Sequence, residues 1–363
     1  MANVLDIRRR IRSVVNTRQI TKAMKTVSAA KLRRAQESAL ASRPYSVMLT
    51  NVLKSLVQRA DIYDPVTGEP RHPLLAERPE KTILAIVITG DKGLAGAFNS
   101  NILRILTKFI DYRSELNVDL ECIGRKGRDF VRRRFPVAPA MPTDGATGST
   151  SFQSVEVATE IPRAGRVQIV GEHVGVLGKV EHAFASELGG QVVERFCRGE
   201  IDGAYILYNE FKSVIAQRLI AERILPIKEI GVIDVRLAEE AVEEERKRRL
   251  EAAKAAGVGV RAVDTRAIDE AAATIAASQV DYIYEQPPER LFRELLPKYI
   301  GNQIFHALLE SVAAEHAARM TAMDSATNNA SDMIDSLTLA MNRARQAKIT
   351  KEIIEIVSGA AAQ

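Results

Sequence analysis

The chain has 363 residues, 46% of them hydrophobic and 27% charged, a composition typical of a soluble globular protein and not of a disordered or membrane-spanning one. Its two cysteines are too few for a disulfide framework, and no apolar signal-peptide segment opens the chain. The net charge of +5 is unevenly distributed. Residues 1–59 hold 13 Lys/Arg and two acidic residues, a net charge of +11, which leaves −6 for the remainder. This basic segment indicates a partner of its own.

The first predicted element is a long N-terminal shaft helix within residues 1–60. Residues 3–40 contain neither Gly nor Pro and are rich in helix-forming residues. The apolar residues form a narrow seam of coiled-coil type with one phase shift: Ile7, Ile11 and Val14, then Ile20, Met24 and Val27. Pro44 is expected to bend or restart the helix, with a second helical segment over 45–60.

A central α/β domain is predicted over residues 81–235, after a proline-rich linker at 61–80. Apolar, β-rich runs alternate with amphipathic segments, which is typical of strands and helices in an α/β fold. The expected strands cover 83–89, 118–123, 204–208 and part of 214–225, and the expected helices cover 99–112, 125–135 and 180–198. Residues 136–178 are expected to form a loop with one or two edge strands.

A charged insertion is predicted over residues 236–280. It contains 13 Ala, eight Lys/Arg and nine Asp/Glu, and its Glu run precedes an Arg/Lys run so that oppositely charged pairs arise one turn apart. We expect a solvent-exposed helix at 237–256, a break at Gly257 and Gly259, and a shorter helix at 266–278.

The last predicted element is a C-terminal shaft helix over residues 290–363. Small apolar residues recur with alternating steps of three and four, which is a strict heptad seam: Met323, Ala326, Ala330, Met333, Leu337, Ala340, Ala344 and Ala347. A helix of this length is too long to be buried in the chain's own core. We therefore expect it to project and to pair antiparallel with the N-terminal helix.

Motifs for catalysis or for ligand binding are weak. The glycine-rich stretch at 90–96 follows a strand and precedes a helix, but it lacks both the P-loop and the GxGxxG spacing, so a tight turn is favoured over a nucleotide site. The five histidines are scattered, and His316 fits a polar seam residue better than a metal ligand. No cofactor, metal or catalytic residue is expected.

The basic N-terminal segment leaves three interpretations open. It could be a solvated face, a nucleic-acid-binding helix, or a rod that meets an acidic protein partner. Nucleic-acid binding is weakened because the basic residues encircle the helix and no aromatic residues interleave with them.

Both ends of the chain resemble one family. Residues 20–36 (ITKAMKTVSAAKLRRAQ) and 41–45 are similar to the N-terminal signature of the γ subunit of F-type ATP synthase. Residues 344–361 (ARQAKITKEIIEIVSGAA) and 318–329 are similar to its C-terminal signature. The resemblance covers nearly the whole chain apart from 136–178 and 236–280. A chance similarity at both ends is very improbable.

The resemblance implies a fold and a function. The fold is a long antiparallel coiled coil of the terminal helices beside a Rossmann-like α/β domain. The function is that of the central rotor shaft, which couples ion-driven rotation of the c-ring to ATP synthesis or hydrolysis at the α3β3 catalytic sites. The chain itself is then non-catalytic, with the α and β subunits, the ε subunit and the c-ring as partners. A basic coiled-coil protein that binds nucleic acid is the alternative.

The resemblance also implies roles for individual residues. The residues expected to contact the β subunits are Lys22, Met24, Lys25, Arg345, Gln346, Thr350 and Glu352. The apolar bearing at the tip is expected to comprise Ile353, Ile354, Ile356 and Val357, and the foot on the ring Tyr282, Tyr284 and Glu285. Because many charges share the basic shaft, replacing Lys22 or Lys25 alone is expected to cost little.

Two further expectations concern location and regulation. No transit segment precedes the N-terminal signature, which favours the cytoplasmic face of a bacterial inner membrane, with the membrane reached only through the c-ring. The 236–280 insertion resembles in position the one in chloroplast-type γ subunits, but it has no cysteine. Thiol regulation is therefore not supported. We expect instead a helical hairpin near the foot that touches ε or the ring, or that limits reverse rotation.

Overall fold

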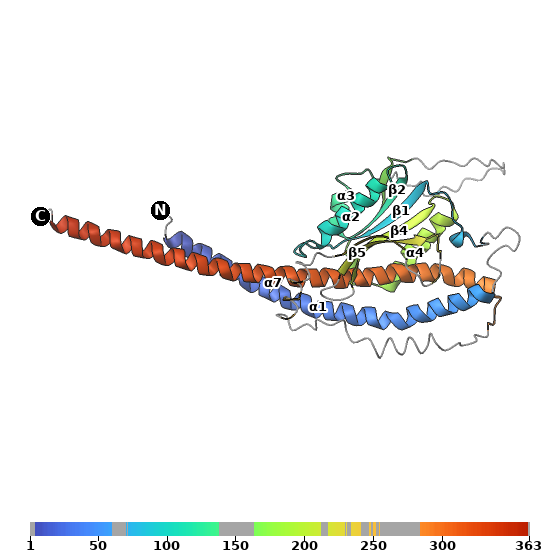
Figure 1. Ribbon diagram of the computed structural model, residues 1–363, viewed down its shortest axis with the longest axis horizontal. Helices are drawn as coiled ribbons and strands as arrows, with labels where there is room; N and C mark the ends of the chain where they lie inside the picture. The colour runs from blue at the N-terminus through green and yellow to red at the C-terminus, as the bar shows by residue number, and fades with distance from the viewer. Residues whose placement is uncertain are drawn as a thin grey trace, which may run out of the picture.

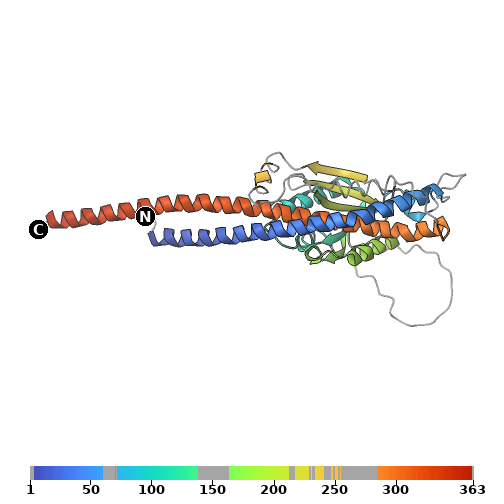
Figure 2. The same ribbon diagram turned by 90° about the horizontal axis from the view of Figure 1, so that it is seen from below.

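The computed structural model describes residues 4–59, 70, 72–137, 163–211, 217–228, 230, 234–240, 247, 250, 251, 254 and 284–361. Two long helices, α1 (Val4–Arg59) and α7 (Pro288–Ala361), lie side by side, and a sheet domain packs on one part of their length (Figures 1 and 2). The other part of the pair projects away from this domain as a rod that carries both termini. This arrangement confirms the expected coiled coil with an α/β domain beside it.

Helix α1 runs without interruption through Pro44, so the expected restart as a second helical segment is wrong. Hydroxyl groups support the backbone around this point, because Ser42 Oγ donates to the carbonyl oxygen of Ala39 at 2.8 Å and Ser46 Oγ donates to that of Ser42 at 3.3 Å. The buried residues Leu49 and Leu53 continue the packing beyond the proline. Packing along the helix thus outweighs the single backbone donor that proline lacks.

The seam of α1 keeps one heptad phase, so the expected phase shift is also wrong. The half-buried or buried positions alternate steps of four and three: Ile7, Ile11, Val14, Arg18, Thr21, Lys25, Ser28, Leu32 and Ala35. Ile20 and Val27 are 60% and 56% exposed instead. The seam of α7 is likewise displaced, since Met333 and Ala340 are exposed whereas Ile334 and Met341 are half-buried. Polar residues occupy the middle of the true seam, which hydrophobic periodicity alone cannot detect.

The sheet domain has six strands in the order β3-β2-β1-β4-β5-β6. The first four are parallel, and β5 and β6 are antiparallel additions at one edge. The strands are β1 (Thr82–Ile88), β2 (Asn117–Ile123), β3 (Val167–His173), β4 (Gly203–Phe211), β5 (Gln217–Leu225) and β6 (Asp234–Glu240). Apolar residues in β1 and β2 are buried on both faces, as helices cover both sides of a parallel sheet.

Helices α2 (Phe98–Tyr112) and α3 (Arg125–Val131) lie on one face of the sheet, and α4 (His182–Cys197) and α7 cover the other (Figure 1). Two single-turn 3₁₀ helices, Pro73–Leu75 and Val176–Gly178, complete the described elements. The core that packs on α4 and α7 includes Leu53, Leu84, Ile206, Phe292 and Ile300. The long shaft helix is therefore part of the domain's own core.

Most expected elements are confirmed, with bounds shifted by a few residues. The helix expected over 237–256 is wrong at its start, because residues 234–240 form β6 and pair with β5. Pairing at an open sheet edge overrides the helix preference of this Ala- and Glu-rich segment. Residues 247, 250, 251 and 254 are helical, and the expected helix at 266–278 lies outside the described residues.

Candidate functional site

The pairing register of the two shaft helices fixes which part of α7 has a partner. The hydroxyls of Thr21 and Thr327 lie 2.8 Å apart, and Asn302 Nδ2 donates to Ser46 Oγ at 2.9 Å. In an antiparallel pair each step forward in one helix is a step back in the other. The first described residue of α1, Val4, therefore falls opposite Ala344, and α7 continues alone beyond this level, as Figure 1 shows.

The projecting end of α7 carries most of the expected contact residues. Arg345, Gln346, Thr350 and Glu352 are all exposed there. Four apolar side chains follow, and each is more than half exposed: Ile353, Ile354, Ile356 and Val357. An exposed apolar cluster of this kind at the tip of a lone helix is typical of a surface that meets another protein.

The contact residues expected on α1 lie at a different level along the shaft axis from those on α7. They do not all face solvent. Lys22 is exposed and Met24 is half-buried. Lys25 points into the shaft, where its Nζ lies 2.5 Å from Asp324 Oδ1. The level of Thr327 is roughly 27 Å from that of Arg345 at 1.5 Å rise per residue. The structure thus separates the expected contacts into two levels and engages the ammonium of Lys25 within the chain.

The expected foot residues sit at the opposite end of α7. Tyr284 is half-buried and packs against the main core cluster, and Glu285 is exposed just before the first turn of α7. Tyr282 lies outside the described residues. The foot and the tip are therefore held at the two ends of one continuous helix of 74 residues, which suits the transfer of motion along its axis.

The crevice at the carboxyl ends of β1 and β4, where doubly wound sheets bind ligands, is filled by α7. A methyl group on Gly90 would lie 2.8 Å from Glu315 Oε1 and 3.3 Å from Asn99 Oδ1. Arg319 Nη2 donates to Glu315 Oε1 at 2.5 Å, and both side chains are buried. The amide of Phe211, at the end of β4, donates to Glu310 Oε2 at 2.7 Å. These contacts fasten the sheet domain to the shaft.

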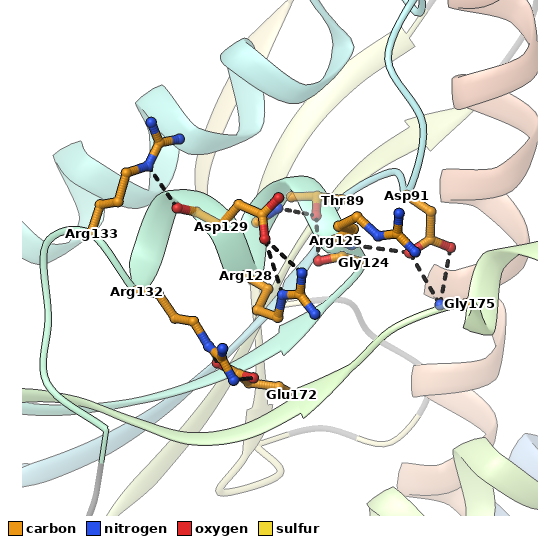
Figure 3. A network of polar contacts seen from close by, with 11 residues as sticks. Thr89, Asp91, Gly124, Arg125, Arg128, Asp129, Arg132, Arg133, Glu172 and Gly175 are labelled. Atoms are coloured by element: carbon orange, nitrogen blue, oxygen red, sulfur yellow. Dashed lines mark hydrogen bonds and ion pairs between the residues drawn. The ribbon is translucent and has the colours of Figure 1, made fainter.

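The glycine-rich turn at 90–96 is likewise engaged by the chain's own groups (Figure 3). Asp91 Oδ1 accepts from the amides of Arg125, the first residue of α3, at 3.0 Å and of Gly175 at 3.1 Å. Thr89 Oγ1 donates to the carbonyl oxygen of Ile123 at 3.0 Å and accepts from the Gly127 amide at 2.8 Å. Within the turn, the Gly90 amide donates to Asn99 Oδ1 at 2.8 Å. Thr89 and Asp91 thus tie the turn to the start of α3 and to the segment before the second 3₁₀ helix, which is a structural role.

His316 lies on α7 beside Arg319, with their Nδ1 and Nη1 atoms 3.3 Å apart. Burial, aided by the charges of Arg319 and Lys31, lowers the pKa of this histidine to about 4, so it is neutral at neutral pH. Among the described residues, no three His, Cys, Asp or Glu side chains gather in a way that could hold a metal ion. In that same part of the chain, no helix is both long and apolar enough to cross a membrane.

Sequence reasoning missed the Glu315–Arg319 pair. The two residues lie one turn apart on the C-terminal helix, and such a pair looks like an ordinary solvated ion pair in a sequence. Their burial depends on the approach of the loop after β1, in which the carbonyl oxygen of Gly93 lies 3.5 Å from Arg319 Nη2. Gly96 in the same loop has a φ of +55°, a backbone conformation that glycine adopts readily. This glycine is the local feature of the sequence that indicates the close approach of the loop.

Comparison with known proteins agrees with this architecture. A family model described as ATP synthase matches residues 3–363. The chain is 44% identical to the ATP synthase gamma chain of Solibacter usitatus and 40% identical to that of Pelotomaculum thermopropionicum, in each case over 100% of this chain and 99% of the relative. In fold it is similar to a chain of the Euglena gracilis mitochondrial ATP synthase (TM-score 0.52, 16% identity, 99% and 94% of the two chains covered). The chain belongs to the family of ATP synthase gamma chains.

Proposed function

We propose that this chain is the central rotor shaft of an F-type ATP synthase. One observation carries the proposal: α7 runs from a foot beside the sheet domain to an exposed apolar tip, and α1 lies beside it only from its first turn to the level of Ala344. The base of the helix is packed in the domain core and its tip is exposed to solvent. Such a helix is suited to a rotor that is turned at its base and held in a sleeve at its tip.

The chain is inferred to do no bond chemistry itself, although it is a subunit of an enzyme complex. The crevice that would hold a nucleotide is occupied by Glu315 and Arg319, which supports a mechanical role for the sheet domain. Rotation of the shaft would change the conformational state of distant catalytic sites. The energetic link between the shaft and these sites is a coupling free energy.

We assign the partners by the chemistry of each level. The basic residues around Lys22 fit acidic segments of the β subunits, and the polar and charged residues from Arg345 to Glu352 fit a second contact with the β subunits. The apolar tip from Ile353 to Val357 fits an apolar sleeve in the hexamer. Such a sleeve allows rotation, because hydrophobic contact is non-directional and imposes no fixed angle.

The foot at Tyr284 and Glu285 is proposed to meet the c-ring and the ε subunit. We propose accordingly that the chain lies on the cytoplasmic face of a bacterial inner membrane and reaches the membrane only through the ring. The 236–280 insertion is proposed to touch ε or the ring. Its deletion must begin after Glu240 in order to spare strand β6. Unchanged rates of ATP synthesis and hydrolysis in that deletion would leave the insertion only a spacer role.

Co-expression with α and β subunits of a close relative tests the central proposal. The expected result is a stable complex whose ATPase activity depends on this chain. A chain that leaves α and β unassembled, and that instead binds DNA with the steep salt dependence of phosphate contacts, would favour the nucleic-acid-binding alternative.

A further inference from the structure

A belt of polar residues interrupts the apolar seam of the shaft close to the sheet domain. We call it the neck, and it comprises Thr21, Lys25 and Ser28 of α1 with Asp324 and Thr327 of α7. Lys25 Nζ lies 2.5 Å from Asp324 Oδ1, and these side chains are only 14% and 11% exposed. The hydroxyls of Thr21 and Thr327 lie 2.8 Å apart, and Thr327 Oγ1 also bonds to the carbonyl oxygen of Met323 at 2.7 Å.

The neck lies where α7 loses the support of the sheet domain. Gly96, in the loop after β1, lies against Ala318 and Ala322 of α7, and Asp324 follows at once. Beyond this level the two shaft helices project together, away from the domain (Figures 1 and 2). Among the described elements, only α1 and α7 connect the domain with the tip, so a twisting load between the two must cross this point through these helices.

The seam on either side of the neck is mainly apolar, apart from half-buried Arg18 in the projecting part and the Asn302–Ser46 hydrogen bond within the domain. The projecting part contains Ile7, Ile11 and Val14 of α1 with Ile334, Leu337 and Met341 of α7. The part within the domain contains Leu32, Leu49, Leu53 and Leu56. Apolar contacts are non-directional and tolerate sliding, whereas a hydrogen bond weakens steeply once its distance and angle change. The neck is therefore the part of the projecting shaft that resists relative displacement of the helices.

Displaced pairings of the two helices would bury an unpaired charge. If α1 moved by one heptad in one direction, Lys25 would lie opposite Ala317. Movement in the other direction would bring Asp324 opposite Leu32. Both Ala317 and Leu32 are fully buried, and a buried charge without a partner is strongly disfavoured. Of these three alignments, only the observed one pairs both charges of the neck.

We propose that Lys25 and Asp324, with Thr21 and Thr327, form a torsional lock. The lock keeps α1 aligned with α7, so that the two helices transmit torque through the neck as one rigid body. This inference rests on the proposed rotor function. It assigns Lys25 a positioning role inside the shaft, in place of a direct contact with the β subunits. Lys22, three residues earlier and exposed, is left as the basic residue available to a partner.

Charge reversal in the assembled complex separates the two roles of Lys25. Lys25→Asp and Asp324→Lys each put two like charges at the neck, and each should lower ATP synthesis about fivefold or more, the lower end of typical coupling effects, while ATP hydrolysis is retained. The double variant Lys25→Asp/Asp324→Lys rebuilds the pair and should restore coupling. Lys22→Asp is the matched control, which Asp324→Lys should not rescue. If the double variant stays uncoupled while Asp324→Ala is silent, Lys25 acts outside the shaft and the lock is refuted.

A cross-link tests the lock without relying on rotor activity. Thr21→Cys/Thr327→Cys, with Cys197→Ser to remove the exposed thiol, should form a disulfide rapidly with copper phenanthroline as oxidant. Adding Lys25→Asp should slow this reaction, and adding Asp324→Lys as well should restore it. Equal cross-linking in all three backgrounds would overturn the lock. If the wild-type chain failed to support ATPase activity of the complex, the rotor function would be refuted. The cross-linking rates would still report on the lock.

Discussion

Arg319 and Glu315 form an ion pair of 2.5 Å within one turn of α7, and both lie buried in the crevice between the ends of β1 and β4. A crevice that holds a ligand in other doubly wound sheets here holds the shaft itself. The sheet domain is attached to α7 by close packing at Gly90 and by the hydrogen bond from the Phe211 amide to Glu310 Oε2 at 2.7 Å. No space for a nucleotide is left beside Gly90.

The buried pair should be far more sensitive to mutation than an exposed pair of the same spacing. Glu315→Gln leaves Arg319 buried without its partner charge, and we expect the free energy of unfolding to fall by about 3 kcal/mol. Glu352→Gln, which breaks the exposed Lys348–Glu352 pair on the same helix, should cost about 0.5 kcal/mol or less. Urea unfolding of the purified variants measures both. Equal losses would contradict the role given to the crevice.

Two adjacent glycines in α4 should respond oppositely to alanine. A methyl group on Gly189 would lie 2.8 Å from the Cα atom of Gly301 in α7, whereas one on Gly190 would meet nothing within 4 Å. Gly189→Ala should therefore destabilise the chain by about 1–3 kcal/mol through overpacking. Gly190→Ala should stabilise it by about 0.5–1 kcal/mol, because alanine favours helix. Thermal unfolding compares the two, and similar melting temperatures would rule out close α4–α7 packing.

Stability should fall as the pH is lowered toward 4, in part because of His316. Its pKa in the folded chain is about 4, below the value of 6.5 for an unperturbed histidine. The unfolded chain therefore takes up this proton first, and stability is lost as the pH falls from about 6.5 to 4. The contribution is on the order of 3 kcal/mol. His316→Gln should reduce the slope of unfolding free energy against pH in that window, and an unchanged slope would exclude the histidine.

Lys22→Ala should change ATP synthesis in the assembled complex by less than about threefold, since exposed ion pairs contribute little individually. The surrounding basic residues share the attraction to an acidic partner. We expect a larger effect for Lys25 than the sequence suggested, because its ammonium is paired inside the shaft. Loss of coupling on replacing Lys22 alone, with assembly intact, would show that the charge is not shared.

The apolar tip should matter only in the complex. Ile353→Ser and Ile356→Ser change side chains that are 54% and 72% exposed, so the unfolding free energy of the purified chain should stay within about 0.5 kcal/mol. Assembly with α and β, or the ATPase activity that depends on it, should fall. Tip variants that assemble and turn over like wild type would remove the bearing role from these residues.

The sequence by itself determined the order and type of most elements. Continuous apolar runs such as 83–89 are buried on both faces of a parallel sheet, and uninterrupted helix-forming stretches at both ends form α1 and α7. These patterns depend on local propensity and burial, which a single sequence records. The family signatures at 20–36 and 344–361 also identified the family and, through it, the expected contact residues.

Only the tertiary structure decided which polar residues lie in the seam and what fills the crevice. Lys25 and Asp324 are far apart in the chain, and each looks like a surface charge until the antiparallel register brings them to 2.5 Å. Ile20 and Val27 look like seam residues in the sequence, but both are exposed once the two helices are paired. Strand β6 likewise follows from an open sheet edge and not from local propensity. Burial of a charge depends on a partner distant in sequence, and hydrophobic periodicity does not encode that partner.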